Sequence, residues 1–362
     1  MAEFDVLLVG PYPPPRGGIS AHVQRLARTI LARGLTTAVI NHFQTQTLDP
    51  LVVGELRRNP WRYWRALRSV QARVVHYHHA RWSTLLATAF ALRRCSASTI
   101  VTVHGQELEP FLRSRIPGVA WVTRRALRAF DVLIAVSVEI EPSLRSLGRP
   151  VKMIPAYLPD HDDQARLSEE TEAFLRQGTN LVVAAHRLVA DGRGRTIYGL
   201  ETAIGSFASA AAIRPRLHLA IFVASGPRSR HERERLWSLI KSVNDDDIRR
   251  RIGVFWGEPL TPAFPFTAIY LRPTLTDGDA VSIREALAAG IPVVASDVVR
   301  RPPGVLTVDS DISNWREAIL QSLECRQPTA GAASDADPAE ELMTIYEALG
   351  CAPRPLAQPA IS

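Results

Sequence analysis

The chain has 362 residues, of which 46% are hydrophobic and 22% are charged, and its formal net charge is +7. This length is too great for one ordinary domain and suits two, and the composition excludes a disordered chain. No stretch reaches the roughly 18 uncharged apolar residues of a membrane helix. The acidic start, MAEFDVLLVG, does not have the pattern of a signal peptide.

The three cysteines, Cys95, Cys325 and Cys351, lie far apart and have neither disulfide nor metal-site spacing. This usage indicates a reducing, cytoplasmic setting. The basic excess is mostly arginine, which suits anionic partners such as nucleotides, nucleic acid or an anionic membrane face. A coding bias that favours arginine over lysine explains the same excess equally well.

Short apolar strands alternate with helical segments in the first half of the chain. The strands are expected at 4–10, 36–40, 73–79, 98–105, 131–137 and 151–155. The helices are expected at 20–33, 61–71, 82–95 and 119–130, and the Pro/Gly loop PYPPPRGG separates the first strand from the first helix.

The alternation begins again after a polar, acidic connection at 156–179, which is expected to contain a short helix. The strands are expected at 180–186, 217–225, 252–257, 268–274, 291–296 and 305–309. The helices are expected at 199–212, 229–243, 281–289, 312–323 and 339–349, the last of which could dock back on the body of the protein.

This alternation predicts parallel α/β sheets in two Rossmann-like domains that face each other across a cleft. The expected boundaries are 1–160, 175–325, and 326–362 for a C-terminal helix with a loose tail. Ligands bind outside the carboxyl ends of the strands in such sheets, so loops that follow strands are the candidates for a site.

The segment TDGDAVSIREA, which starts at Thr276, forms such a loop and the beginning of a helix. The first amides of a helix lack intrahelical acceptors and carry partial positive charge, so they suit a diphosphate. Asp277 is expected at the loop tip, pointing into the cleft. An ordinary strand-to-helix turn with acidic residues near a helix start is the alternative. The other candidates here are Gly278, for close backbone approach, Asp279, the amides of Ala280, Val281 and Ser282, and Glu285, which would accept hydrogen bonds from a ribose.

This segment resembles the E-x7-E region of retaining glycosyltransferases of the GT-B fold, the large family-4 type. Glu285 and the following ALAAGIPVVAS match closely, whereas Asp277 stands where the family has its first Glu. The resemblance implies that the first carboxylate contacts the donor sugar and that Glu285 binds the nucleotide ribose. Because Asp is one methylene shorter, the role of the first carboxylate shifts or passes partly to Asp279.

Other segments match in the expected order, so the resemblance spans roughly residues 4 to 325. It implies that the amides of Gly17 and Gly18 lie near the donor phosphates and the acceptor, and that His104, in VTVHGQE, lies by the donor sugar. The alternatives are a tight turn for the glycines and a surface strand end for His104. Ser137, in DVLIAVS, is expected to be structural.

The segment AAHRLVADGRGRTIYG resembles the place where an Arg and a Lys neutralise the donor diphosphate. Arg187 matches the family's Arg, but Tyr198 occupies the position of the Lys. Cations here would stabilise the charge that develops as the diphosphate leaves. Arg193 and Arg195, in the intervening loop, are candidates to replace the missing Lys.

Two further patterns bear on partners. His76, His78 and His79 lie on one strand without a carboxylate or Cys at ligand spacing, so no metal is expected.

Residues 57–73 mix Arg with Trp61, Tyr63 and Trp64, which suits an anionic membrane surface. An Arg-rich solvated helix with its aromatics in the core is the alternative. No nucleic-acid motif is present.

The resemblance therefore implies a metal-independent, retaining glycosyltransferase without a cofactor. A nucleotide diphosphate sugar would bind mainly to the C-terminal domain, and a glycan or lipid-linked acceptor mainly to the N-terminal one. The expected setting is the synthesis of cell-surface polysaccharide or glycoconjugate, in the cytoplasm or peripherally on the inner face of the membrane. Two alternatives remain open: a catalytically impaired nucleotide-sugar-binding partner subunit, and a sugar-nucleotide epimerase of similar fold.

Overall fold

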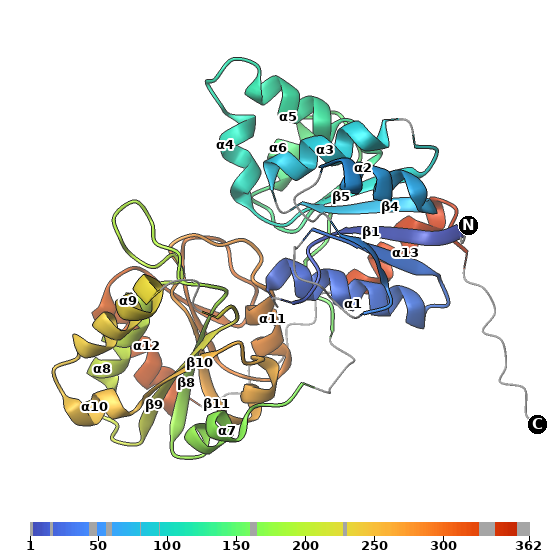
Figure 1. The fold of residues 1–362 in the computed structure, drawn as a ribbon. Coiled ribbons are helices and arrows are strands. Elements are labelled where there is room, and N and C mark those ends of the chain that lie inside the picture. Colours follow the sequence, from blue (N-terminus) through green and yellow to red (C-terminus); the bar gives the residue numbers. More distant parts are fainter. Residues whose placement is uncertain are drawn as a thin grey trace, which may run out of the picture. The chain divides into compact units, whose positions relative to one another are not determined.

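The computed structural model divides the chain into two compact units (Figure 1). Unit 1 comprises Met1–Asp160 together with Ser334–Ser362, and unit 2 comprises His161–Ala333. The structure describes residues 3–14, 17–42, 49–55, 60–79, 81–93, 95–159, 165–226, 230–325 and 337–352.

Unit 1 is built on a seven-stranded sheet in the order β3-β2-β1-β4-β5-β6-β7, with all neighbouring strands parallel. Its inner strands are continuous apolar runs because both faces of the sheet are covered. The strands are β1 (Glu3–Gly10), β2 (Thr37–Asn41), β3 (Val52–Glu55), β4 (Gln71–His79), β5 (Ser98–Val103), β6 (Val132–Ala135) and β7 (Val151–Met153).

Helices cover the two faces of this sheet. One face carries α1 (Gly18–Ala32) and α13 (Pro338–Ala348), and the other carries α2 (Pro60–Ser69), α3 (Trp82–Leu92) and α5 (Val119–Leu127) (Figure 1). The core between the sheet and the first pair of helices includes Val6, Leu8, Leu26, Ile30 and Tyr346, which are almost fully buried. The short helices of unit 1 are η1 (Gln106–Leu108), α4 (Glu109–Leu112) and α6 (Glu141–Arg145).

Unit 2 repeats the architecture with a six-stranded parallel sheet in the order β10-β9-β8-β11-β12-β13. The strands are β8 (Thr179–Ala185), β9 (Leu217–Val223), β10 (Ile252–Trp256), β11 (Thr267–Arg272), β12 (Val293–Ser296) and β13 (Val305–Val308). The helices are α7 (Glu169–Leu175), α8 (Leu200–Ala211), α9 (Arg230–Lys241), α10 (Asp246–Arg250), η2 (Thr261–Phe266), α11 (Val281–Ala288) and α12 (Ile312–Glu324).

Two cores hold unit 2 together, one on each face of its sheet. Leu200, Phe207 and Trp315 pack on one face from α8 and α12. Ile283 and Ala286 of α11 pack on the other face. The expected α/β class with two Rossmann-like domains is therefore confirmed.

The sequence missed several short elements. Strand β3 lies at the edge of its sheet, is four residues long and contains Gly54, so it lacks the apolar run that marks a strand. Helix α10 is too short for a periodic signal, whereas α7 is the short helix expected within the connection at 156–179. Both are capped, α7 by the Ser168 hydroxyl and α10 by the Asp245 carboxylate, which accept hydrogen bonds from the first backbone amides.

Helix α13 belongs to unit 1 rather than to a separate C-terminal segment. The Tyr346 hydroxyl lies 2.6 Å from Nδ1 of His76 on β4, and the Cys351 thiol lies 3.4 Å from the carbonyl oxygen of Asp5. The stretches 326–336 and 353–362, which include the predicted loose tail, lie outside the described residues.

No helix within the described residues is long and apolar enough to cross a membrane. All three cysteines are free.

Candidate functional site

Both sheets reverse their strand order next to their first strand, between β1 and β4 in unit 1 and between β8 and β11 in unit 2. Ligands bind at such switch points, outside the carboxyl ends of the strands. The predicted site residues all lie beyond the carboxyl ends of strands at or beside the switch point of their own unit. In unit 1 they follow β1 and β5, and in unit 2 they follow β8 and β11.

Arg187 follows β8 in unit 2 and is half-buried. Among the described residues, none forms a hydrogen bond or an ion pair with its guanidinium group. A partly buried guanidinium without an internal counter-charge is available to an anionic ligand.

The two arginines predicted to replace the missing Lys lie in a turn closed by an antiparallel bridge between Ala190 and Thr196. Arg195 is already paired with Asp191, at 3.0 Å from Nη2 to Oδ2. Arg193 is exposed, and only its backbone amide binds Asp191.

Asp277 turns inward, so its carboxylate does not project from the loop tip as the sequence suggested. Its side chain is 7% exposed and forms ion pairs with Arg272 and Arg301. Five donors reach its two oxygens: two from Arg272, and one each from Arg301, the Thr274 hydroxyl and the Gly278 amide. A carboxylate has about four lone-pair sites, so Asp277 has no free lone pair for a metal ion.

The two guanidinium groups make this burial possible. Burial alone would raise the pKa of Asp277, but Arg272 and then Arg301 outweigh that effect and lower it to about 2. Burial is the largest single effect on Arg272 and would lower its pKa, but Asp277, Tyr270 and Tyr198 together outweigh burial and raise the pKa above its usual value. The cluster of one carboxylate and two guanidinium groups therefore keeps a net positive charge.

Tyr198 lies against this cluster. The guanidinium carbon of Arg272 is 5.3 Å from the centre of the Tyr198 ring. Gly199, the next residue, has a φ of 66° and approaches the backbone of Pro273 so closely that a Cβ atom would lie 1.7 Å from its carbonyl oxygen. Any other residue at 199 would push α8 away from the end of β11.

Helix α11 starts at Val281 beside the cluster. No described residue accepts a hydrogen bond from the amides of Val281 and Ser282, whereas the next amide, of Ile283, binds the Ala280 carbonyl. The Ser282 hydroxyl accepts a hydrogen bond from Tyr270 at 2.8 Å. The structure therefore brings an open helix N-terminus next to the end of β11, as the sequence predicted.

The two other carboxylates of the segment differ in their settings. Asp279 is 6% exposed in its side chain and pairs with Arg284, with Nε 2.7 Å from Oδ1. Glu285 is half-buried, one turn into α11. Asp277 and Asp279 are thus both engaged by arginines of their own unit, and their roles toward a donor sugar stay predictions.

In unit 1 the glycine pair opens α1. Gly17 is the N-cap, in an extended conformation, and its amide donates to the Ser20 hydroxyl at 2.8 Å. A Cβ atom on Gly18 would meet no atom within 4 Å. The start of α1 is therefore open enough for a ligand to come close to the protein backbone.

His104 lies directly after β5 and is half-buried beside two other histidines, His22 of α1 and His78 of β4. The ring centres are 5.0 Å apart for His22 and His104, 5.2 Å for His22 and His78, and 5.4 Å for His78 and His104. Nδ1 of His78 and Nε2 of His104 are 3.1 Å apart. Burial holds the pKa of His104 well below its usual value, so the imidazole is neutral near pH 7.

The other histidines of β4 have separate surroundings. His76 is fully satisfied, with Nδ1 2.6 Å from the Tyr346 hydroxyl and Nε2 2.7 Å from the Thr102 hydroxyl. His79 is buried, and neither of its ring nitrogens has a partner within the described part of the chain.

Sequence reasoning missed Arg272, Arg301 and His22 as members of these clusters. Arg272 ends an apolar strand, and a charge at that position is itself a signal, since inner strands of parallel sheets are otherwise apolar. Arg301 and His22 come from segments distant in sequence, so no local pattern reveals them.

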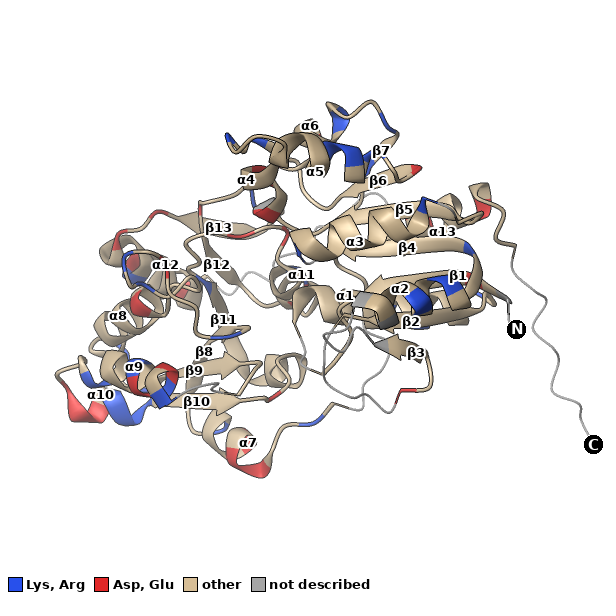
Figure 2. Ribbon diagram, turned by 45° about the horizontal axis from the view of Figure 1, so that its top comes forward, with Lys and Arg blue, Asp and Glu red and all other residues tan. Residues whose placement is uncertain are grey.

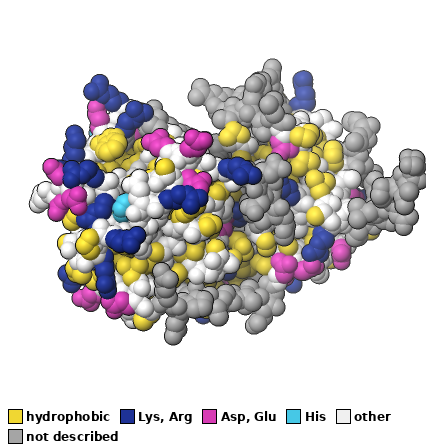
Figure 3. Space-filling model, turned by 90° about the horizontal axis from the view of Figure 1, so that it is seen from below, with side chains coloured by type: hydrophobic (Ala, Val, Ile, Leu, Met, Phe, Trp, Pro, Cys, Tyr) yellow, Lys and Arg dark blue, Asp and Glu magenta, His cyan; other side chains and the backbone are white. Residues whose placement is uncertain are grey.

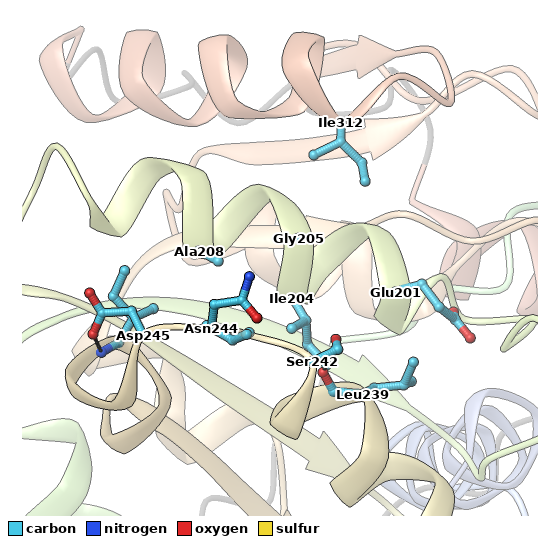
Figure 4. A pocket seen from close by; sticks show the side chains of 11 residues that line it. Glu201, Ile204, Gly205, Ala208, Leu239, Ser242, Asn244, Asp245 and Ile312 are labelled. Carbon is cyan, nitrogen blue, oxygen red and sulfur yellow. Dashed lines mark hydrogen bonds between the residues drawn. The ribbon is translucent and has the colours of Figure 1, made fainter.

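A groove of about 450 Å³ lies elsewhere in unit 2, between α8, α9 and the start of α12 (Figure 4). Ile204, Ala208 and Leu239 line it with apolar surface. Glu201 is also part of its wall, but its carboxylate already binds the Thr196 amide at 2.8 Å. This groove does not include the residues at the ends of β8 and β11.

Comparisons with known proteins identify the fold. Residues 16–156 match the family model of Glycosyltransferase Family 4. No curated protein sequence matches the chain.

Solved structures match almost the whole chain. An apo structure of OtsA matches with a TM-score of 0.68 at 12% identity, covering 96% of this chain and 99% of that one. A UDP-forming trehalose-phosphate synthase from Burkholderia xenovorans, in complex with glucose-6-phosphate, matches with a TM-score of 0.68 at 14% identity over 95% and 100% of the two chains. HepE of Anabaena, in complex with UDP, matches with a TM-score of 0.65 at 12% identity over 95% and 97%.

At these identities the solved structures establish the fold, and the family model covers most of the N-terminal unit. The resemblance read from the sequence is thereby confirmed: the chain has the GT-B fold of glycosyltransferases, and its residues 16–156 match Glycosyltransferase Family 4.

Proposed function

We propose that this protein is a retaining glycosyltransferase that moves a sugar from a nucleotide diphosphate sugar to a glycan or lipid-linked acceptor. The observation that carries the proposal is in unit 2. Arg187, whose guanidinium has no partner among the described residues, and the open N-terminus of α11 both lie at the switch point between β8 and β11. A guanidinium group and free helix amides are the donors that hold a diphosphate.

The net charge of the neighbouring cluster supports the same assignment. Arg272 and Arg301 together carry one more positive charge than Asp277 neutralises. This excess positive charge lies against Tyr198, which occupies the position where the family has a Lys. It attracts the negative charge that develops on a leaving diphosphate. We therefore propose that the diphosphate is held without a metal ion.

The proposed step breaks the bond between the anomeric carbon and the diphosphate oxygen, and the diphosphate leaves with the electron pair. The acceptor hydroxyl oxygen bonds to the same carbon from the same face, so the configuration is retained. The hydroxyl proton passes to the departing diphosphate oxygen. Glu285 binds the ribose of the nucleotide, and His104, neutral because of its burial, binds a hydroxyl of the donor sugar.

A membrane-bound acceptor is supported by one surface of unit 1. Trp61 of α2, Phe90 of α3 and Trp121 of α5 are 77%, 69% and 65% exposed, and α3 contacts both of the other helices. Arg68 stacks on Trp64, 4.5 Å from its ring centre, and Arg125 lies 5.7 Å from the ring centre of Trp121. Exposed aromatics with arginines beside them suit the interface of an anionic membrane.

The charges around this surface differ from those on another face of the molecule. Figure 2 shows basic residues on α2 and around α5 and α6. On the face shown in Figure 3, basic and acidic side chains are interleaved.

The part of the predicted membrane segment that contains Arg57 and Arg58 lies outside the described residues. Tyr63, by contrast, is buried and binds the Thr88 hydroxyl, so this aromatic belongs to the core.

The experiment is a calorimetric screen of the full chain against UDP, GDP, ADP and dTDP sugars, each with and without Mg²⁺ or Mn²⁺. One nucleotide sugar should bind without a divalent ion. Glu285→Gln should weaken it, whereas Arg195→Ala, whose side chain already pairs with Asp191, should not. Failure of every nucleotide sugar to bind, or binding that requires Mg²⁺ or Mn²⁺, would contradict the proposal.

Turnover then separates the remaining alternatives. Release of nucleoside diphosphate with an acceptor present supports a transferase. Isomerisation of the donor sugar without an acceptor would identify an epimerase. Tight donor binding with neither reaction, across a panel of glycan and lipid-linked acceptors, would identify an impaired binding subunit.

A further inference from the structure

We propose that His22, His78 and His104 form a binding site for one divalent transition-metal ion such as Zn²⁺. One ring nitrogen of each side chain lies within 4.8 Å of the others. The three come from different elements of unit 1: His22 from α1, His78 from the end of β4, and His104 from the loop after β5. This proposal goes beyond glycosyl transfer and does not depend on it.

Two of these rings have a buried nitrogen that the rest of the protein leaves unused. His22 is 2% exposed and His78 is fully buried. Nε2 of each has no hydrogen-bond partner within the described residues. Buried polar atoms are almost always satisfied, so the unpaired Nε2 of His22, beside His78 and His104, calls for a missing water or ion.

The tautomer of His22 is suited to metal binding. Its Nδ1 lies 2.5 Å from the carbonyl oxygen of Ala156, and because a carbonyl only accepts, this nitrogen carries the proton. The neutral ring then has its lone pair on Nε2, the nitrogen without a partner. A backbone carbonyl that fixes the far nitrogen of a histidine is the usual support for a metal ligand.

The distance between the other two rings is already close to that of a metal site. Nδ1 of His78 and Nε2 of His104 are 3.1 Å apart, and two nitrogens on one tetrahedral zinc are about 3.4 Å apart. In the protein without metal, one of these nitrogens donates to the other. With a metal bound, each would offer its lone pair and keep its proton on the other ring nitrogen, so no proton need be released.

The protonation state of the cluster agrees with this arrangement. Burial lowers the pKa of His22 to about 4 and holds those of His78 and His104 well below their usual value. All three rings are therefore neutral at pH 7, as metal ligands must be.

Three neutral imidazoles leave the charge of the ion uncompensated, and Arg25, whose charge also lowers the pKa of His22, adds to it. We therefore expect a fourth ligand, hydroxide or another anion, on the half-exposed side of His104. Three protein ligands with an open position are the pattern of a reactive rather than a closed site.

This ion differs from a metal on the strand itself, which the sequence did not lead us to expect. No carboxylate or Cys lies at ligand spacing from His76, His78 and His79, and the structure gives His76 two hydroxyl partners. The further ligand is His22, which α1 brings from a part of the sequence far from His78.

The test is a calorimetric titration of chelator-treated, dialysed full-length protein with ZnCl₂, together with the absorption spectrum of the Co²⁺ form. One Zn²⁺ per chain should bind, and the Co²⁺ spectrum should show four-coordinate geometry. His22→Gln and His78→Gln should each weaken Zn²⁺ binding at least tenfold. The matched control is His79→Gln, also buried on β4, whose ring nitrogens have no hydrogen-bond partner among the described residues; this variant should bind as the wild type does.

Circular dichroism of each metal-free variant establishes that it is folded. If His22→Gln does not fold, His104→Asn takes its place, because His104 is the least buried of the three. The proposal is overturned if the wild type shows no saturable Zn²⁺ binding, which would leave water as the occupant. It is equally overturned if folded cluster variants bind Zn²⁺ as tightly as His79→Gln does.

Discussion

Arg272 and Asp277 form a two-point ion pair at the carboxyl end of β11, with Nε 3.0 Å from Oδ2 and Nη2 3.0 Å from Oδ1. Arg301 adds a third contact, at 2.8 Å to Oδ2. The triplet Asp277-Gly278-Asp279 has the spacing of a metal clamp, but its first carboxylate is enclosed by guanidinium groups. The pair therefore fixes the loop that leads into α11 and leaves positive charge beside it.

Replacement of Asp277 by Asn should destabilise unit 2 strongly. It would leave Arg272 and Arg301, which are 13% and 2% exposed, without their counter-charge. Breaking a buried ion pair on one side costs about 3–5 kcal/mol. The free energy of unfolding, measured in denaturant by tryptophan fluorescence, should fall by that amount.

Asp279→Asn is the matched control for this change. Its partner Arg284 is 24% exposed and can reach water, so the loss should be nearer 1 kcal/mol. If both variants lost the same free energy of unfolding, the pairing of Asp277 with two arginines would stabilise unit 2 no more than the single pair of Asp279 does.

Much of the fold could be predicted from the sequence because its strands are continuous apolar runs and its helices have a regular period. The helix predicted at 281–289, for example, is α11 at Val281–Ala288. The interior of the site could not be predicted in the same way. Whether Asp277 points out or in depends on Arg301, which is 24 positions away in sequence, and such a long-range pair leaves no local pattern.

The same limit applies to His22. It lies on the buried face of an amphipathic helix, where sequence alone indicates a core position. Its neighbours His78 and His104 come from two other elements, and only the strand order β1-β4-β5 brings them to it. Residues at the ends of neighbouring strands could be predicted to lie close together. The sequence could not show that a residue of a helix lies against those strand ends.

Unit 1 should lose stability on mild acidification before unit 2 does. Burial lowers the pKa of His22 and His79 to about 4 and of His42 and His76 to about 3, and holds those of His78 and His104 well below 6.5. Since each folded pKa lies below the unfolded one, unfolding takes up protons. The stabilisation is complete above pH 6.5 and falls as the pH is lowered toward these values. At pH 5 the loss is about 2 kcal/mol for each of the four histidines with a pKa of about 3 or 4, namely His22, His42, His76 and His79.

In unit 2 the main contributions to the pH dependence of stability behave differently. Asp277, with a pKa lowered to about 2, stabilises above its unfolded pKa of 3.8 and loses that contribution only as the pH falls toward 2. Unit 2 also contains His218, whose pKa is lowered mainly by burial. Hydrogen exchange followed by mass spectrometry at pH 7 and pH 5 should show peptides of unit 1 losing protection first. Equal loss in both units would contradict this order.

Arg187→Ala should weaken binding of the nucleoside diphosphate that the screen identifies by about tenfold or more, because a hydrogen bond to a charged group contributes about 1.5–3 kcal/mol. It should leave the thermal unfolding midpoint unchanged, since no described residue pairs with this guanidinium. Arg193→Ala tests the exposed arginine of the adjoining turn. A larger loss from Arg193→Ala than from Arg187→Ala would assign the diphosphate contact to the turn instead.

The exposed aromatics of unit 1 should carry membrane binding. The triple variant Trp61→Ala, Phe90→Ala, Trp121→Ala removes three side chains that are each at least 65% exposed, so it should bind anionic vesicles much more weakly while its fold is unchanged. Trp237→Ala, a tryptophan of unit 2 that is 46% exposed, is the control and should bind as the wild type does. Co-sedimentation with phosphatidylglycerol vesicles measures this binding, which should decrease with added salt because arginines flank the aromatics. If the triple variant and the wild type sediment alike, or if neither binds, the surface does not serve a membrane and a water-soluble glycan becomes the acceptor to test.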